Sequence, residues 1–383
     1  MTAVFTIVAD GDIPTTKILS QVINFPGSAI ARKIIIGEIQ PADTAATPLL
    51  FSRVCDPKYA WLPIWLKKAK ARYAYYLDDN LWEYRADNHV ARYYARPDVQ
   101  MCLNRFIAKA AYVIVNSERL GSEVSRRFPG ANIILLPAPM DFSHIDLSIS
   151  PSLSGPLRVG YAGSDRGEAF NEVAKAIDSL LSTHPEMFEF EFIGHPPPLL
   201  LRGKVAHFGA LESYDEFIEF KQSRAWNVGL APLQDDPFSR CKTNNKYREY
   251  GALSIAGAYS AVFPYSDCVS QLTDGILVSN NQLDWRNALL FLASNRSCCA
   301  RIGEAARKNV RERHGLEKVA PTWRDTLLAL SLKTATLNPA RYLSWFVHLA
   351  RYLLTRDLQQ AMTLYREGGL RNVVQSIVRR LLR

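Results

Sequence analysis

Several features that would assign a function at once are missing from this 383-residue sequence. It has no run of 18 or more apolar residues, which excludes an ordinary membrane-spanning helix. Its six cysteines are scattered without Cys-x-x-Cys spacing, so we expect reduced thiols rather than a disulfide framework. Neither a metal-spaced His/Cys cluster nor a Gly-x-Ser-x-Gly elbow occurs, which leaves zinc and serine-hydrolase chemistry without support.

The two common glycine-rich phosphate motifs are also absent. Gly160, Gly163 and Gly167 do not have the Gly-x-Gly-x-x-Gly spacing, and no Gly-Lys-Ser/Thr triplet occurs. The first residues, MTAVFTIVADGD, lack a basic leader and a small-residue cleavage site, so they are typical of a first strand rather than a signal peptide. These observations predict a cytoplasmic protein.

The composition is that of a folded protein, with 48% apolar and 22% charged residues, and the length suits two domains. The net charge of +9 is unevenly distributed. Residues 331–383 contain nine Lys and Arg against two Asp and Glu, so most of the positive charge belongs to the C-terminal tail.

Strand-like runs alternate with helical segments, which predicts an α/β fold with two Rossmann-like lobes built on parallel sheets. A Ser/Pro/Gly-rich stretch at 148–156 is suited to a linker. We therefore assign 1–150 to a first lobe, 151–330 to a second lobe and 331–383 to a basic amphipathic helical tail. The expected strands are 4–9, 33–36, 73–77, 112–115 and 133–136, followed by 157–162, 189–193, 205–208, 227–231, 261–263 and 276–278.

The end of the tail, LRNVVQSIVRRLLR, places its apolar residues on one helical face and its arginines on the other. This pattern predicts that residues 340–383 dock on an anionic membrane surface, with support from the basic run WLKKAKAR at 65–72. The alternative is an ordinary helix packed on the body of the protein. Nucleic acid is not an expected partner, because 366–383 has no interleaved aromatic residues for stacking.

The stretch FSRCKTNNKYREYG, residues 238–251, contains two lysines and an acid in a pattern that suits an anion site. The strand before it ends at Ala231, and a helix starting near Thr243 would begin at the carboxyl edge of the second sheet, where ligands bind. Lys242 and Lys246 would then lie beside free N–H groups and the positive helix end. The alternative is a solvated polar face balanced by Glu249.

A second stretch, RVGYAGSDRG at 158–167, runs from a strand into a helix expected from Glu168. The absence of a side chain at Gly163 would allow a diphosphate to approach the backbone there, beside Ser164. Taken alone, this stretch is equally consistent with a plain strand-to-helix turn.

Together, these segments resemble the donor half of bacterial glycosyltransferases of the GT-B type, in the broad retaining family four. The resemblance covers about 157–315 and is specific around 229–250. The residues that match the family pattern there are Gly229 to Leu233, Asp235-Asp236, Pro237-Phe238, Lys242-Thr243, Lys246 and Glu249-Tyr250. One departure is Cys241, which occupies the first position of the family's Glu-x7-Glu pair and removes a contact to the sugar.

The resemblance implies roles for these residues. Lys242 and Lys246 would hold the diphosphate of a nucleotide sugar and stabilise it as it leaves, which makes them the candidate catalytic residues. Thr243 belongs to the same donor motif, Glu249 would accept hydrogen bonds from the ribose, and Gly163 with Ser164 would close the other side of the phosphates.

The stretch YLDDN resembles the acidic segment that many of these transferases carry in the acceptor lobe. Asp78 and Asp79 end an expected strand and would face the crevice between the lobes, and His89 is a further acceptor-side candidate. Alternatives are a metal site of the Asp-x-Asp kind, a helix cap at Asp79 or Asn80, and a merely exposed histidine. No metal is expected, because lysines and helix dipoles can stabilise a leaving diphosphate.

The implied activity is transfer of a sugar from a nucleotide-diphosphate donor to a hydroxyl of a glycan or lipid-linked acceptor, with retention. It would serve cell-surface polysaccharide or lipopolysaccharide assembly at the inner face of the membrane. Two alternatives remain: a non-catalytic GT-B protein that binds a nucleotide or a partner, which Cys241 favours, and a nucleotide-sugar epimerase.

Overall fold

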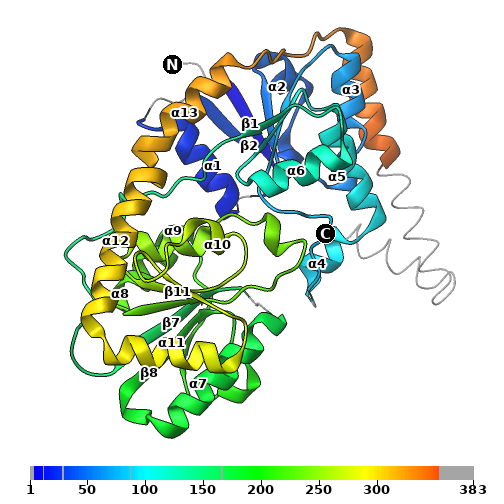
Figure 1. Ribbon diagram of the computed structural model, residues 1–383. Helices are drawn as coiled ribbons and strands as arrows, with labels where there is room; N and C mark the ends of the chain where they lie inside the picture. Colours follow the sequence, from blue (N-terminus) through cyan, green and yellow to red (C-terminus); the bar gives the residue numbers. More distant parts are fainter. Residues whose placement is uncertain (1–3, 12, 28–29, 87, 165–166, 353–383) are drawn as a thin grey trace, which may run out of the picture.

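The computed structural model describes residues 4–11, 13–27, 30–86, 88–164 and 167–352, and it consists of two lobes (Figure 1). Each lobe is built on a parallel six-stranded sheet. The predicted α/β class with two Rossmann-like lobes is therefore confirmed. The predicted amphipathic helix at 370–382 lies outside the described residues.

The first sheet has the strand order β2-β1-β3-β4-β5-β6, and all its neighbours are parallel. Its four inner strands are almost entirely buried, which is typical of a sheet covered by helices on both faces, whereas the edge strands β2 and β6 are partly exposed. The sequence did not predict β3. The strands are β1 (Phe5–Ala9), β2 (Ala31–Ile35), β3 (Leu49–Ser52), β4 (Ala74–Leu77), β5 (Tyr112–Val115) and β6 (Ile133–Leu135).

The second sheet has the order β12-β11-β10-β7-β8-β9 and is also parallel throughout. The strand expected at 261–263 was wrong, because the strand here is β11 (Ala256–Ser260), whose residues are small except for Tyr259. A Cβ on Gly257 would lie 2.0 Å from the Tyr259 ring, so the space there admits only a small residue. The other strands are β7 (Leu157–Gly163), β8 (Phe188–Gly194), β9 (Ala206–Phe208), β10 (Val228–Ala231) and β12 (Ile276–Val278).

The helices cover both sheets, and most of them connect successive strands. Those of the first lobe are α1 (Pro14–Asn24), α2 (Pro41–Ala46), α3 (Leu62–Lys68), α4 (His89–Tyr94), α5 (Pro97–Lys109) and α6 (Glu118–Arg127). Those that follow are α7 (Asn171–Thr183), α8 (Tyr214–Ser223), α9 (Asn245–Ala252), α10 (Tyr265–Cys268), α11 (Gln282–Ser294), α12 (Arg296–His314) and α13 (Leu316–Ala329).

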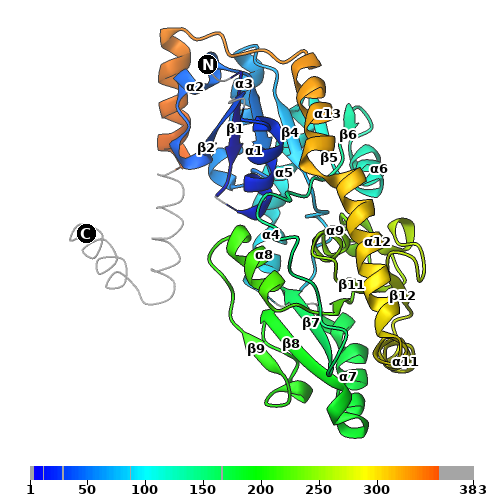
Figure 2. The same ribbon diagram turned by 90° about the vertical axis from the view of Figure 1, so that its left-hand side faces the viewer.

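The C-terminal helices return the chain to the first lobe. In Figure 2, α12 and α13 run along one side of the molecule from the second lobe to the first. Leu316, Trp323 and Leu327 of α13 are buried in one core with Leu19 and other side chains of α1 and the first sheet. The return at Leu316 falls inside the range 151–330 that the sequence assigned to the second lobe. A further helix, at 339–352, packs on the first lobe as well.

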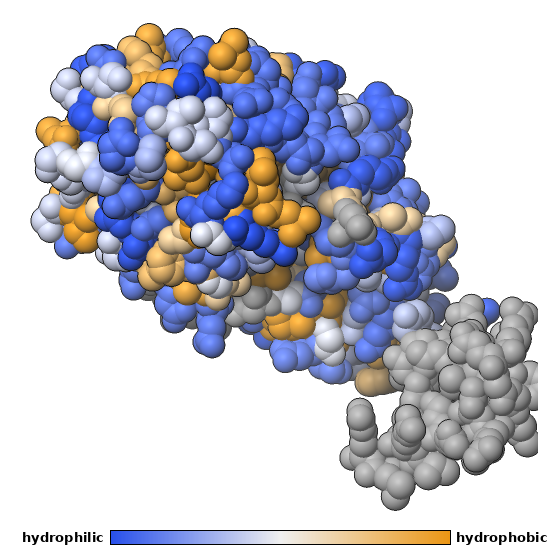
Figure 3. Space-filling view, turned by 90° about the horizontal axis from the view of Figure 1, so that it is seen from below, coloured by the Kyte–Doolittle hydropathy of each residue, from blue (hydrophilic) through white to orange (hydrophobic). Residues whose placement is uncertain are grey.

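The surface seen from below in Figure 3 is largely hydrophilic, with scattered apolar side chains. Among the described residues, none of the helices is both long and apolar enough to cross a bilayer.

Candidate functional site

The residues that follow the strands of both sheets meet across the gap between the lobes. Asn80, just after β4, donates from Nδ2 to the carbonyl of Pro237 at 3.2 Å. Lys242 Nζ lies 3.0 Å from Asp79 Oδ1, and the rings of Tyr84 and Phe238 stack with centroids 4.5 Å apart. The carboxyl edges of the two sheets therefore face each other, and the expected interlobe site is the place where they meet.

A buried charge cluster lies under the start of α9. Glu249 Oε2 accepts hydrogen bonds from Lys246 Nζ at 2.9 Å and from Lys221 Nζ of α8 at 2.7 Å, and all three residues are buried. Burial favours the neutral acid, but the ammonium groups of Lys221 and Lys246 outweigh it and lower the pKa of Glu249 to about 2. Burial also lowers the pKa of Lys221 to about 8, although Glu249 opposes that change. The cluster holds two cations and one anion.

Close packing of small residues holds α9 over the second sheet. A Cβ on Gly229 of β10 would come within 2.7 Å of the Tyr250 ring, so the glycine lets this ring lie directly on the strand. Tyr250 also donates from its hydroxyl to the carbonyl of Leu230 at 2.8 Å. This contact keeps Lys246 and Glu249 at the carboxyl edge of the sheet.

The glycine predicted to approach a phosphate lies next to one of the predicted lysines. Gly163 ends β7 with a φ of +148°, which favours glycine, and a Cβ there would lie 3.4 Å from Lys246 Cε and Nζ. Ser164 follows as an exposed residue whose carbonyl accepts a hydrogen bond from the Tyr161 hydroxyl. The structure therefore brings Gly163, Ser164 and Lys246 together at one edge.

Lys242 does not lie on the helix that carries Lys246. Helix α9 begins at Asn245, so Lys242 lies in the segment before it and extends to the first lobe, where it pairs with Asp79. Thr243 is half-buried, and its hydroxyl donates to Asn245 Oδ1 at 2.8 Å. The two lysines approach the crevice from different directions, so a diphosphate between them would have to replace the contact of Lys242 with Asp79.

Asp78 and Asp79, the carboxylates predicted on the acceptor side, belong to a network with an arginine that the sequence did not single out. Arg53, just after β3, lies 3.0 Å from Asp78 Oδ1 and 3.3 Å from Asp79 Oδ2. Thr15 donates to the other oxygen of Asp78 at 2.7 Å. Burial raises the pKa of Asp78, and the Arg53 guanidinium opposes the rise.

One alternative interpretation of residues 78–80 was a metal site, and these contacts do not favour it. Arg53 and Lys242 already neutralise both carboxylates. In the part of the chain that the structure describes, no three His, Cys, Asp or Glu side chains are grouped so that they could hold a metal ion. His89 is the exposed first residue of α4 and lines none of the three cavities described next.

Three neighbouring cavities follow the crevice. One of about 360 Å³ lies beside Ser164 and His195, one of about 500 Å³ between Gly167 and Lys242, and one of about 1000 Å³ between α6 and the loops after β10 and β11. The first two share Gly167 and Glu168, and the last two share Lys242. They form a path from the second lobe to the first, with Lys242 in its middle.

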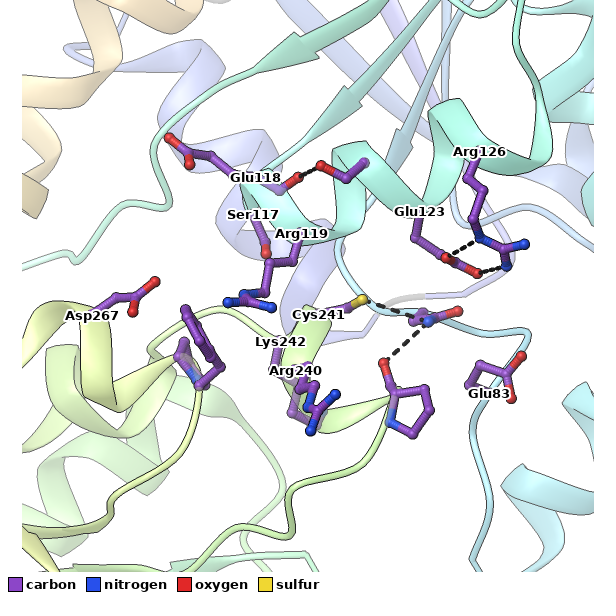
Figure 4. Close-up of a pocket in the computed structure, with 15 residues that line it drawn as sticks. Glu83, Ser117, Glu118, Arg119, Glu123, Arg126, Arg240, Cys241, Lys242 and Asp267 are labelled. Atoms are coloured by element: carbon purple, nitrogen blue, oxygen red, sulfur yellow. Dashed lines mark hydrogen bonds and ion pairs between the residues drawn. The ribbon is translucent and has the colours of Figure 1, made fainter.

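The largest of these three cavities is lined mostly by polar residues, with charges of both signs (Figure 4). Ser117, which caps α6, and Glu118 and Arg119 of α6 line it from the first lobe. They face Arg240 and Cys241 of the second lobe. Cys241 is buried, its Sγ lies 3.5 Å from Asn80 Nδ2, and burial raises the pKa of its thiol. The thiol is therefore uncharged and forms part of the lining of this cavity.

The comparisons with known proteins come from structure. No protein-family model and no curated protein matches the sequence. Anabaena HepE in complex with UDP is similar with a TM-score of 0.61 at 11% identity, over 85% of this chain and 100% of its own. Sucrose-phosphate synthase from Thermosynechococcus elongatus gives 0.62 at 14% identity, over 86% and 100%. The pneumococcal O-GlcNAc transferase GtfA, in complex with UDP and GlcNAc, gives 0.52 at 14% identity, over 73% and 56%.

At these identities, the similarity establishes the fold. The chain has the GT-B fold, in which two Rossmann-like lobes face each other across a crevice, and the fold implied by the sequence resemblance is confirmed.

Proposed function

We propose that this protein is a glycosyltransferase that moves a sugar from a nucleotide diphosphate to a hydroxyl group, with retention. The observation that carries the proposal is the cluster of Gly163, Lys246, Lys221 and Glu249 at the carboxyl edge of the second sheet of a GT-B fold. A cluster with surplus positive charge beside an open backbone turn suits a diphosphate.

The cavities suggest how the donor lies. The base fits the cavity beside His195, the diphosphate fits the edge formed by Gly163, Ser164 and Lys246, and the sugar extends toward Lys242 and Cys241. Glu249 lies in reach of this edge and remains the candidate partner of the ribose. We propose UDP as the nucleotide to test first, because structurally similar proteins have been solved with UDP bound.

The chemistry then depends on charge. The bond from the sugar to the diphosphate breaks, the acceptor hydroxyl oxygen bonds to the same face of the oxocarbenium-like centre, and its proton passes to the leaving diphosphate. Negative charge grows on the leaving diphosphate, where Lys246 and the positive end of α9 stabilise it. Lys221 stays with Glu249, so Lys246 can turn to the phosphate without leaving a bare buried carboxylate. Lys242 contacts the diphosphate as well, once its ion pair with Asp79 has broken.

The acceptor is proposed to enter by the largest cavity, near Asp78 and Asp79 of the first lobe. The polar residues that line this cavity include cations and anions, which can donate hydrogen bonds to sugar hydroxyls and accept hydrogen bonds from them. A glycan or lipid-linked acceptor in cell-surface polysaccharide or lipopolysaccharide assembly is the pathway-level proposal, and it rests on analogy of fold.

The direct test is turnover of UDP-sugars with a panel of glycan and lipid-linked acceptors, followed by UDP release and by NMR of the product's anomeric configuration. Acceptor-dependent UDP release with retained configuration supports the proposal. Conversion of the donor sugar without an acceptor would point to the epimerase. Tight UDP binding without any conversion across the panel would favour the non-catalytic alternative.

Asp79→Asn is expected to strengthen nucleotide binding, because it releases Lys242 from the first lobe. A partly exposed ion pair contributes about 0.2–1 kcal/mol, so the gain is at most about fivefold in Kd. Titration calorimetry with UDP measures it, and Asp98→Asn, which breaks an exposed pair with Arg96 and lines none of the three cavities, is the matched control. Weaker binding in Asp79→Asn would show that the ion pair assists the site rather than competing with it.

A further inference from the structure

One flank of the first lobe carries a surface that sugar transfer does not use. It is formed by α3 and the helix at 339–352, which lies against α3 in Figure 1. Trp345 is buried between Trp61 and Trp65, each with ring centroids 4.9 Å away in edge-to-face geometry. Trp65 also donates from Nε1 to the Ser344 hydroxyl at 3.0 Å. The orientation of the helix is therefore fixed.

This packing leaves an apolar stripe exposed to solvent. Leu343, Phe346 and Val347 are 67%, 52% and 54% exposed, and their spacing of three and four residues places them on one helical face. Tyr342 and, on α3, Ile64 are exposed as well. A helix already anchored by a buried tryptophan gains nothing in the folded lobe from three further bulky apolar residues on its outer face.

Every charged residue of the two segments that form this surface is basic. Residues 61–72 and 339–352 contain no Asp or Glu, and their cations are Lys67, Lys68, Lys70, Arg72, Arg341 and Arg351. Burial lowers the pKa of His348, and the nearby charges of Lys68 and Arg351 lower it further, which places cations from both segments around one histidine. An apolar stripe among cations fits an amphipathic, negatively charged partner.

We propose that α3 and the helix at 339–352 dock the protein on an anionic lipid bilayer. The stripe enters the headgroup boundary and the lysines and arginines contact lipid phosphates. Other occupants fit less well, because they carry charge of the same sign. A second copy would bring the same cations, and residues 353–383 contain six arginines against Asp357 and Glu367.

The test is co-sedimentation of the full-length protein with phosphatidylcholine vesicles, with and without phosphatidylglycerol. We expect pelleting only with the anionic vesicles, and its loss in a Leu343→Glu, Phe346→Glu variant. The matched control is Leu283→Glu, an equally exposed leucine on α11 of the second lobe, which should pellet like the wild type. UDP titration of each variant shows separately that the fold and the nucleotide site are intact.

The charge contribution is tested by Lys67→Gln and Lys68→Gln. Each lysine removed should weaken binding to anionic vesicles about fivefold, and the effect should shrink in high salt. Equal pelleting of the wild type and the Leu343→Glu, Phe346→Glu variant would overturn the proposal. The proposal would also be overturned if the wild type did not pellet with anionic vesicles. A wild-type dimer that the double substitution abolished would overturn it as well.

Discussion

Lys246→Ala is expected to lower kcat by about 10²–10³-fold with a competent donor and acceptor. Loss of one preorganised group that stabilises developing charge typically raises the barrier by about 2.7–4 kcal/mol. The fold should survive, because Lys221 and Glu249 remain as a neutral buried pair 2.7 Å apart. The measurement is steady-state kinetics of UDP release, with circular dichroism as a check on folding.

Two comparisons sharpen this prediction. Lys175→Ala removes an exposed lysine of α7 that pairs with Glu172, and it should leave kcat unchanged. Lys246→Arg keeps the charge and should retain part of the activity, although the wider guanidinium fits the space beside Gly163 less well. Wild-type turnover in Lys246→Ala would remove Lys246 from the mechanism.

Glu249→Gln is expected to destabilise the protein by about 3–5 kcal/mol at neutral pH, because it leaves Lys221 and Lys246 buried without a carboxylate. Lys221→Met leaves Glu249 paired with Lys246 and should cost clearly less. Denaturant unfolding of the two variants measures the difference. Equal losses would show that packing, and not charge balance, dominates in this cluster.

The same cluster predicts a pH dependence. The pKa of Lys221 is lowered from 10.5 to about 8 in the folded protein, so the unfolded chain binds more protons between these values and stability rises with pH there. In Glu249→Gln the pKa of Lys221 should fall further, so the stability deficit should narrow as the pH rises above neutral. In the wild type, the contribution of Glu249 is present above pH 4.5 and is lost as the pH falls toward 2.

Much of the fold could be predicted, because a buried parallel strand leaves a short apolar run between turn residues. The expected strand at 112–115 corresponds to β5 without a shift. Leu49–Ser52 was missed because only three of its four residues are apolar, whereas all four residues of β5 are apolar. Arg53, which follows it with a φ of +56°, was missed with it. At 261–263, Val262 and Phe263 favoured a strand by composition, whereas the close-packed small residues just before them form it.

The site was only partly predictable, because some of its contacts depend on local sequence and others on tertiary packing. The placement of Lys246, Glu249 and Gly163 at one edge of the second sheet could be predicted, because it depends on local spacing. Lys221 could not, because its partner Glu249 lies 28 residues away and only tertiary packing brings α8 against α9. The one signal in the sequence was a lysine in a segment rich in aromatic residues. In the structure, the Lys221 ammonium lies 4.1 Å from the centroid of the Phe217 ring. The pairing of Lys242 with Asp79 depends on how the lobes close, which no local pattern encodes.

The most direct test of the donor site is isothermal titration of UDP, GDP, ADP, CMP and dTDP into the wild type and a Lys242→Ala, Lys246→Ala variant. The site described here predicts micromolar binding of one nucleotide diphosphate, UDP first, and its loss in the variant. Binding that survives in the variant would place the nucleotide elsewhere. No binding of any nucleotide by the wild type would contradict a nucleotide-sugar site in this crevice.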